Sequence, residues 1–165
     1  MKMADYRIRD AVINDCEGIF TNIKELAVHH HSPNGVKLTV DTLKKDGFGE
    51  NPLFRCQVAE NINSGEIIGH ALFFPFYSSW IGKGMFMEDL FVTERERSKG
   101  VGVALLKRLV KLCVEEGFIR LQWEVMEFNK RGMNFYNKQG AQDTTADGGR
   151  RVFRFNKEQM EEYLQ

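Results

Sequence analysis

The fold is decided by residues 85–117, which read MFMEDLFVTERERSKGVGVALLKRLVKLCVEEG. This segment opens with the mostly apolar run Met85–Val92, which predicts a strand. Between Gly100 and Glu116, leucines recur every three or four residues with lysines and arginines between them, so an amphipathic helix follows. Gly117 predicts the end of that helix, because glycine readily adopts the left-handed conformation that closes helices.

A second strand and a second helix follow this pair. Apolar and polar residues alternate from Ile119 to Val125, which predicts a strand. Residues Asn129–Gln139 have helical spacing, and Gly140 follows as their stop. The strand–helix–strand–helix order of Met85–Gly140 indicates a crossover in which the two strands run parallel.

The N-terminal half predicts shorter elements joined by turns. We expect strands at Tyr6–Ile8, Phe54–Glu60 and Ile67–Phe76, and helices over 13–28, capped by Asn14 or Asp15, and over Val40–Lys45, stopped by Asp46-Gly47. Pro75 predicts a bulge or a sheet edge, and Trp80–Gly84 a loop. Short turns between the strands favour antiparallel pairing. A last strand near 152–155 and a short helix over 157–164 complete an α/β fold, with a mixed central sheet and helices on both faces.

Length and charge limit the classes of function. The chain has 165 residues, of which 42% are hydrophobic, so a single folded domain over 1–165 is expected. Lysine plus arginine and aspartate plus glutamate each number 23, and the formal net charge is zero. This balance disfavours attraction to nucleic acid or to a membrane surface as a general function.

Cysteine usage and the N-terminus indicate the compartment. The three cysteines are widely spaced and form no Cys-x-x-Cys pair, so neither a disulfide framework nor a zinc site is indicated. The first residues, MKMADYRIRD, are too charged for a secretory signal. No run of about 18 apolar residues could span a bilayer. We therefore expect a cytoplasmic protein.

The loop Arg97-Ser98-Lys99-Gly100-Val101-Gly102 lies between the predicted strand Met85–Val92 and the amphipathic helix that ends at Glu116. Its glycines let successive backbone N–H groups point into one concavity, and the helix N-terminus adds partial positive charge. With the charges of Arg97 and Lys99, the loop suits a pyrophosphate. It lacks the lysine–serine/threonine ending of an ATP-binding P-loop and the Gly-x-Gly-x-x-Gly dinucleotide pattern. The alternative is an ordinary strand-to-helix turn with solvated charges.

Further motifs surround this loop. They are Glu88-Asp89-Leu90-Phe91-Val92, then Arg97-x-x-Gly100-x-Gly102, then Asn129, and Asn134-Phe135-Tyr136 before Gly140-Ala141. In this combination the sequence resembles the GCN5-related N-acetyltransferases, over roughly Tyr6 to Phe155. The segments 23–27, 46–52 and 80–83 are similar to its diamine (spermidine/spermine) N1-acetyltransferase branch, and within it to the thialysine Nε-acetyltransferase type.

The resemblance implies acetyl-CoA as the cosubstrate. Its pyrophosphate would lie on the loop formed by Arg97, Ser98, Lys99, Gly100, Val101, Gly102 and Val103. The backbone of Leu90, Phe91 and Val92 would pair with the pantetheine arm, and Asn129, Lys130, Arg131 and Gly132 would hold the other side. Many relatives have glycine at the position of Ser98. Because the side chain of Ser98 is small and its N–H remains available, we expect little loss of pyrophosphate binding.

The same resemblance assigns two catalytic residues. Tyr136 would be the general acid that protonates the CoA thiolate, since a phenol of pKa about 10 can donate to a thiolate held within hydrogen-bond reach. Glu88 would take a proton from the ammonium substrate, through water. Strand alternation predicts that Glu88 shares a face with Phe86, Leu90 and Val92, and that Asp89 points to the opposite face. The alternative for Tyr136 is an aromatic side chain that only packs in the core, and the alternative for Glu88 is a strand glutamate that only forms a salt bridge.

The family chemistry is direct transfer. The free amine would attack the thioester in a ternary complex, and the Leu90 N–H would polarise the carbonyl. None of the cysteines lies in a nucleophile motif, so no acyl-enzyme is expected. The resemblance also implies a homodimer.

Cationic substrates favour acidic and aromatic walls. The candidates of these types are Trp80, Glu88, Asp89 and Glu124. The resemblance implies that the substrate side is also lined by His29, His30, Gln122 and Trp123, together with Glu124. Polyamine-preferring relatives have Asp-Pro-Trp where this chain has Ser78-Ser79-Trp80, so a shorter amine such as thialysine or a small diamine is at least as consistent as spermidine. Consecutive histidines at 29–31 point about 100° apart on a helix and cannot readily chelate one ion, so no metal is expected.

Two other classes of function stay open at this point. One is a protein or peptide acetyltransferase of the same superfamily. The other is a non-catalytic CoA-binding module, which the presence of both Glu88 and Tyr136 disfavours.

Overall fold

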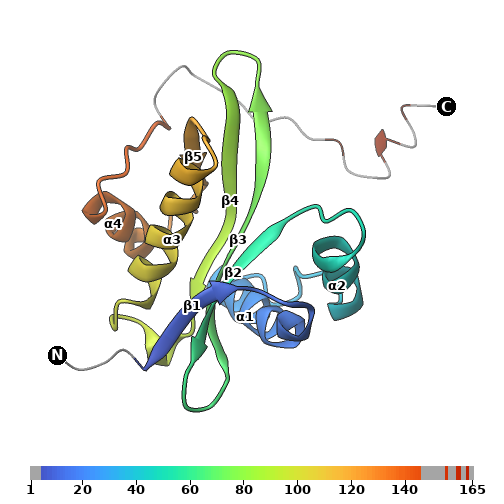
Figure 1. The fold of residues 1–165 in the computed structure, drawn as a ribbon, viewed down its shortest axis with the longest axis vertical. Coiled ribbons are helices and arrows are strands. Elements are labelled where there is room, and N and C mark those ends of the chain that lie inside the picture. Colours follow the sequence, from blue (N-terminus) through green and yellow to red (C-terminus); the bar gives the residue numbers. More distant parts are fainter. Residues whose placement is uncertain (1–4, 146–154, 156–158, 161–162, 164–165) are drawn as a thin grey trace. The chain divides into compact units, whose positions relative to one another are not determined.

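The computed structural model describes residues 5–145, 155, 159–160 and 163. Within these residues one sheet has the strand order β1-β2-β3-β4-β5 (Figure 1). Its strands are β1 (Tyr6–Asp10), β2 (Arg55–Asn61), β3 (Ile67–Ser78), β4 (Gly82–Val92) and β5 (Arg120–Gln122). The first three junctions are antiparallel, and β4 and β5 are parallel. The predicted mixed sheet and parallel crossover are therefore confirmed.

The helices are α1 (Cys16–His29), α2 (Val40–Phe48), α3 (Val101–Glu115) and α4 (Lys130–Lys138), with 3-10 turns η1 (Ile13–Asp15) and η2 (Glu94–Glu96). The chain divides into two compact units, Met1–Glu124 and Val125–Gln165. The sheet and α1 to α3 belong to the first unit, and α4 belongs to the second. No helix among the described residues is long and apolar enough to cross a membrane.

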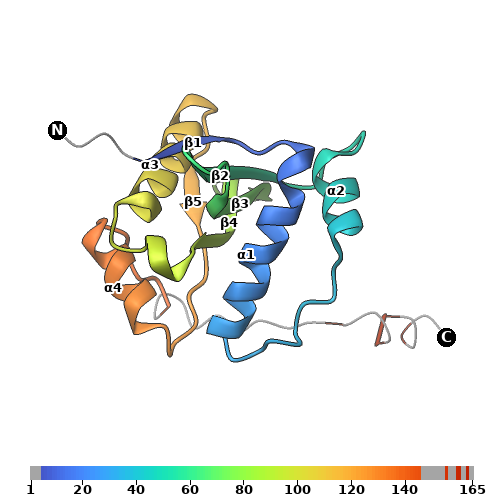
Figure 2. The ribbon, with the colours of Figure 1, turned by 90° about the horizontal axis from the view of Figure 1, so that it is seen from below.

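Helices cover both faces of the sheet, with α1 and α2 on one face and α3 on the other (Figure 2). Val58 and Leu72 lie in a core with α1 and α2, whereas their neighbours Ala59 and Ala71 pack with α3, at Leu105. Because successive residues of a strand point to opposite faces, both faces of these strands are apolar and both are covered. This confirms the prediction of helices on both faces.

Several predicted boundaries are wrong. Helix α2 continues past Asp46-Gly47 to Phe48. Gly47 is explained by close packing instead of a helix end, since the Phe54 ring lies 2.3 Å from where a Cβ would be. The predicted loop 80–84 is shorter, since Gly82–Gly84 pairs with the end of β3.

Other differences concern the sheet edges and the C-terminus. Strand β5 ends at Gln122, three residues before the predicted Val125. Pro75 lies on β3 beyond Phe73, the last residue that pairs with β2, so it is at a sheet edge, as expected. The bulge of the β3–β4 pair lies elsewhere, at the register shift between Leu72 and Phe73. The elements expected at 152–155 and 157–164 fall mainly outside the described residues.

A polar network joins β1, β2 and the start of α1. Arg9 donates hydrogen bonds to the carboxylates of Asp15, at 2.6 Å, and of Glu60. Asp15 also accepts from the Val12 N–H at 2.7 Å, so its side chain is not the helix cap that the sequence predicts. Burial alone would raise the pKa of Asp15, but the hydrogen bonds from Arg9 and Val12 outweigh it and lower the pKa. Hydrogen bonds from Arg9 likewise lower the pKa of Glu60.

We expect Arg9→Met to lower the free energy of unfolding by about 2 kcal/mol at pH 7, because it leaves the buried Asp15 carboxylate without its cation and Glu60 with only the exposed Arg7. Carboxylates with lowered pKa stabilise the fold above their unfolded pKa of about 4, and that contribution disappears as the pH falls through the folded pKa. The difference between the two proteins should therefore shrink below about pH 4. Urea unfolding from pH 7 to pH 3 measures it.

Arg7→Met is the matched control, since Arg7 pairs with the same Glu60 but its side chain is 61% exposed. It should cost less than about 1 kcal/mol. Equal losses for the two variants would contradict the assigned role of Arg9.

Candidate active site

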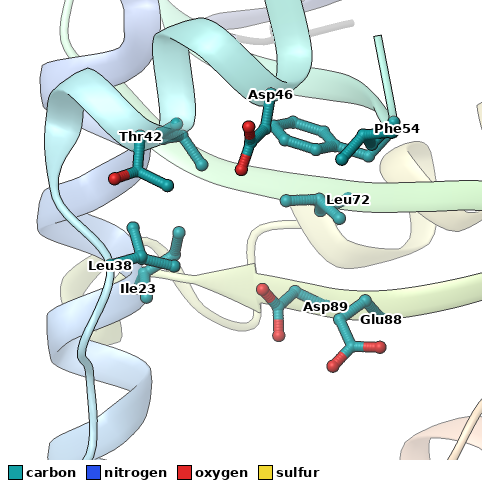
Figure 3. A pocket seen from close by; sticks show the side chains of 10 residues that line it. Ile23, Leu38, Thr42, Asp46, Phe54, Leu72, Glu88 and Asp89 are labelled. Atoms are coloured by element: carbon teal, nitrogen blue, oxygen red, sulfur yellow. The ribbon is translucent and has the colours of Figure 1, made fainter. Parts of the chain in front are cut away.

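A β-bulge in β4 places Glu88. Across the strand pair, Asp89 lies opposite Leu72 and Met87 lies opposite Phe73, so Glu88 is an extra residue without a partner on β3. One extra residue reverses the alternation of side chains beyond it. The carboxylates of Glu88 and Asp89 consequently line the same pocket (Figure 3).

This geometry corrects the prediction from strand alternation. Leu90 and Val92 pack with the α3 side of the sheet, so Glu88 does not share their face. Asp89 does not point away from Glu88. Uninterrupted alternation cannot place two consecutive side chains together, and only the bulge makes this possible.

The pocket has a volume of about 320 Å³ and lies between α1, α2, β3 and β4. Its lining residues are Ile23, Leu38, Thr42, Leu43, Asp46, Leu53, Phe54, Leu72, Glu88 and Asp89. The ionisable side chains of this lining are all acidic, with Asp46 contributed by α2 and the other two by β4 (Figure 3). Apolar walls with carboxylates of one sign suit a cation that carries an aliphatic chain.

Glu88 has the electrostatic environment of a proton acceptor. Its side chain is exposed at the pocket, yet partial burial raises its pKa, and the neighbouring charges of Asp89 and Glu124 raise it further. A carboxylate whose pKa is raised toward the working pH accepts protons more readily than an ordinary one.

The other predicted substrate residues do not line this pocket. They are His29 and His30 at the end of α1, Trp80 in the turn between β3 and β4, Gln122 on β5, and Trp123 and Glu124 just after it. Trp80 is 90% exposed. Glu124 and His30 lie within electrostatic reach, because Glu124 acts on Glu88 and the charge of Asp89 acts on His30.

Sequence reasoning missed Asp46. It interpreted Asp46-Gly47 as the stop of a helix, whereas Asp46 is helical and lines the pocket. Its spacing of three from the buried Leu43 could have indicated it, since residues three apart lie on the same side of a helix.

The predicted phosphate loop has the backbone of an anion cradle. Ser98 has φ +64° and Gly100 has φ +87°, which turn the chain sharply before α3. Gly100 is the N-cap of α3 and supplies no capping side chain, so the amides of the first turn, at Val101, Gly102 and Val103, keep their N–H groups for another acceptor. This backbone fits a pyrophosphate.

The cationic side chains of the loop are engaged within the protein. Arg97 donates through Nε to the Val92 carbonyl at 2.9 Å, and its guanidinium lies 5.4 Å from the centre of the Phe91 ring. Lys99 pairs with Glu96 at 3.0 Å. These contacts brace the loop, so the backbone N–H groups are its main donors toward an anion.

The end of β4 has an unpaired edge. Strand β5 pairs only with Gly84–Phe86, so among the described strands Met87–Val92 is paired on one side, by β3. Leu90, Phe91 and Val92 thus lie where an extended ligand could add as a further strand.

In the second unit, Asn129 caps α4. Its side chain accepts a hydrogen bond from the Gly132 N–H at 2.9 Å, and Lys130 and Arg131 occupy the first turn. The half-buried Tyr136 lies on the same helix, with the Phe135 ring edge-on at 5.1 Å. The roles of these residues toward cofactor and substrate stay predictions.

A metal centre has no counterpart in the described part of the chain. No group of three or more His, Cys, Asp or Glu side chains there is placed to hold an ion. The thiols of Cys16, Cys56 and Cys113 are each free and buried.

Comparisons with known proteins identify a family. Residues 20–141 match the Acetyltransferase (GNAT) family. The chain is 37% identical over 166 residues to a thialysine N-epsilon-acetyltransferase of Mus musculus, covering 97% of this chain and 98% of that protein. It is 36% identical to spermidine/spermine N(1)-acetyltransferase-like protein 1 of Homo sapiens, covering 94% of this chain and 23% of that protein.

Among solved structures, an integron cassette protein of V. cholerae has the same fold. Its TM-score is 0.78 at 20% identity, with 98% of each chain covered. At this identity the likeness concerns the fold alone.

The loop predicts a stabilising substitution. Ser98→Gly should raise the free energy of unfolding by about 1 kcal/mol, because a side chain at positive φ strains the backbone and glycine removes that strain. Thermal unfolding measures the gain. Lys99→Gly is the control; Lys99 is not at positive φ, so this change should give no gain. A less stable Ser98→Gly protein would show that the contacts of Ser98 outweigh the backbone strain at this position.

Proposed function

This chain belongs to the acetyltransferase (GNAT) family, and on that premise we propose that it transfers acetyl from acetyl-CoA to the primary amine of a small cationic acceptor. The observation that carries the proposal is the pocket whose ionisable lining is entirely acidic, with Glu88 and Asp89 on one side and Asp46 on the other. The acceptors that fit are a diamine, a polyamine or thialysine.

We also propose a homodimer, which gel filtration with light scattering tests.

Two features support acetyl-CoA as the donor. The turned backbone at Ser98–Val103 offers N–H groups to a diphosphate, and the unpaired edge at Leu90–Val92 offers main-chain partners to an extended arm.

Three groups would then divide the reaction. Glu88, with its raised pKa, takes a proton from the acceptor ammonium through water, because the protonated amine has no lone pair with which to attack. The Leu90 N–H donates to the thioester carbonyl as negative charge develops there. Tyr136 gives its proton to the departing thiolate as the C–S bond breaks. The second proton lost by the attacking nitrogen returns to the Tyr136 phenolate, which completes direct transfer to a neutral amide without an acyl-enzyme.

A panel of acceptors tests the function. The protein is assayed for release of free CoA from acetyl-CoA with putrescine, spermidine, thialysine and a lysine peptide. We expect kcat/KM to be highest for one of the small amines. A peptide that exceeds all of them would favour a protein acetyltransferase instead. Binding of acetyl-CoA without turnover of any acceptor would favour a non-catalytic CoA-binding module.

The raised pKa of Glu88 predicts the acid limb of the pH profile. Activity needs the deprotonated carboxylate, so kcat/KM for the amine should fall as the pH drops through a midpoint above the usual glutamate pKa of about 4.3. Asp89→Asn removes a neighbouring negative charge and should move this midpoint to lower pH. Glu124→Gln should move it in the same direction. A midpoint unaffected by both changes would contradict the assignment of the limb to Glu88.

Tyr136→Phe tests the general acid. We expect turnover to fall by about 100-fold, the usual contribution of a positioned proton donor, with unchanged affinity for acetyl-CoA by calorimetry. Tyr77→Phe is the matched control, since Tyr77 is 80% exposed on β3 and should retain full turnover. Wild-type turnover in the Tyr136→Phe protein would remove its assigned role.

A further inference from the structure

His70 is a buried imidazole behind the acidic pocket. It lies on β3, where its relative exposure is 0%, and it faces the α1 and α2 side of the sheet, as its β2 partner Val58 does. Its Nε2 lies 3.6 Å from Oδ2 of Asp89, which lines the pocket. The Phe91 ring packs beside it, with centroids 6.3 Å apart.

The buried imidazole of His70 lowers the stability of the fold. Neither ring nitrogen has a hydrogen-bond partner among the described residues. A buried polar group without a partner destabilises a fold by about 1–3 kcal/mol, whereas an apolar ring of similar shape would not. A buried polar group that does not stabilise the fold needs another explanation, and Asp89 is the group toward which it is directed.

Asp89 needs such a donor. The other ionisable residues of the pocket, Asp46 and Glu88, carry the same charge and repel it. Groups on the adjoining elements that also feel the Asp89 charge are His30 from α1 and Cys56 from β2. An N–H at Nε2 of the imidazole would donate a hydrogen bond to the Asp89 carboxylate and fix its direction.

We propose that His70 is a positioning residue, which holds the ionised Asp89 carboxylate in the orientation that binds the ammonium of the acceptor. The inference rests on the proposed function and adds a residue to it. The 3.6 Å separation shortens to a hydrogen bond when the acceptor is bound, since hydrogen bonds of active sites commonly tighten in the substrate complex.

Steady-state kinetics and thermal unfolding of His70→Phe test the proposal, with the best acceptor of the panel. The KM for the amine should rise by about tenfold, as expected for the loss of one hydrogen bond to a charged group, while the KM for acetyl-CoA stays unchanged. The melting temperature should stay equal or rise, because an unpartnered buried polar group is gone. His70→Gln, which retains an N–H donor, should recover part of the amine affinity.

A double-mutant cycle shows whether His70 acts through Asp89. In an Asp89→Asn background, His70→Phe should change the amine KM by less than about twofold, since the partner carboxylate is already lost. Thr93→Val is the matched control, because it also replaces a buried, unpartnered polar group and Thr93 does not line the pocket. Its amine KM should equal that of the wild type.

The outcomes separate this inference from the proposed function. A wild-type protein that acetylates no amine overturns both. If the wild type is active, an unchanged amine KM in His70→Phe overturns the positioning role alone. So does an equal increase in the Asp89→Asn background, or a lowered melting temperature with both KM values raised, which would mark His70 as part of the packing only.

Discussion

The bulge at Glu88 is the constraint on which the candidate site depends. Because Glu88 has no partner on β3, the ladder slips by one residue and Asp89 turns to the same side of the sheet. Two consecutive carboxylates then meet Asp46 of α2 across an apolar pocket. Partial burial, added to by the charges of Asp89 and Glu124, raises the pKa of Glu88. The three carboxylates of the pocket favour a cationic ligand between them. A regular strand would have sent one of these carboxylates into the core beneath α3.

The other half of the site is built from backbone rather than side chains. Strand β5 leaves β4 after Phe86, which frees the edge that continues through Leu90 to Val92. The chain then turns through Ser98 and Gly100 into an uncapped helix N-terminus. The guanidinium of Arg97 donates a hydrogen bond to the Val92 carbonyl and packs over the Phe91 ring, which holds the loop against the strand. Main-chain N–H groups that are held this rigidly need little reorganisation to bind an anion.

Patterns that depend on neighbours along the chain were predicted well. The apolar run Met85–Val92, the leucine spacing of α3 and the alternation from Ile119 predicted the crossover, and the parallel pairing of β4 with β5 confirmed it. Predictions failed where a distant residue decides. The Phe54 ring packs where a side chain at position 47 would lie, so Gly47 belongs to α2 instead of ending it. The pairing of Gly82–Gly84 with β3 shortens a predicted loop. A local pattern does not report these contacts.

The sequence by itself determined the order of strands and helices, the mixed sheet, the position of the candidate phosphate loop and the family, because each follows from periodicity or from motifs within short segments. Only the tertiary structure decided that Glu88 and Asp89 share a face, that Asp46 joins them, and that a buried imidazole at His70 lies against Asp89. These features depend on strand register and on helix packing. Register is set by the sum of contacts across the sheet, and no single stretch of residues carries that sum.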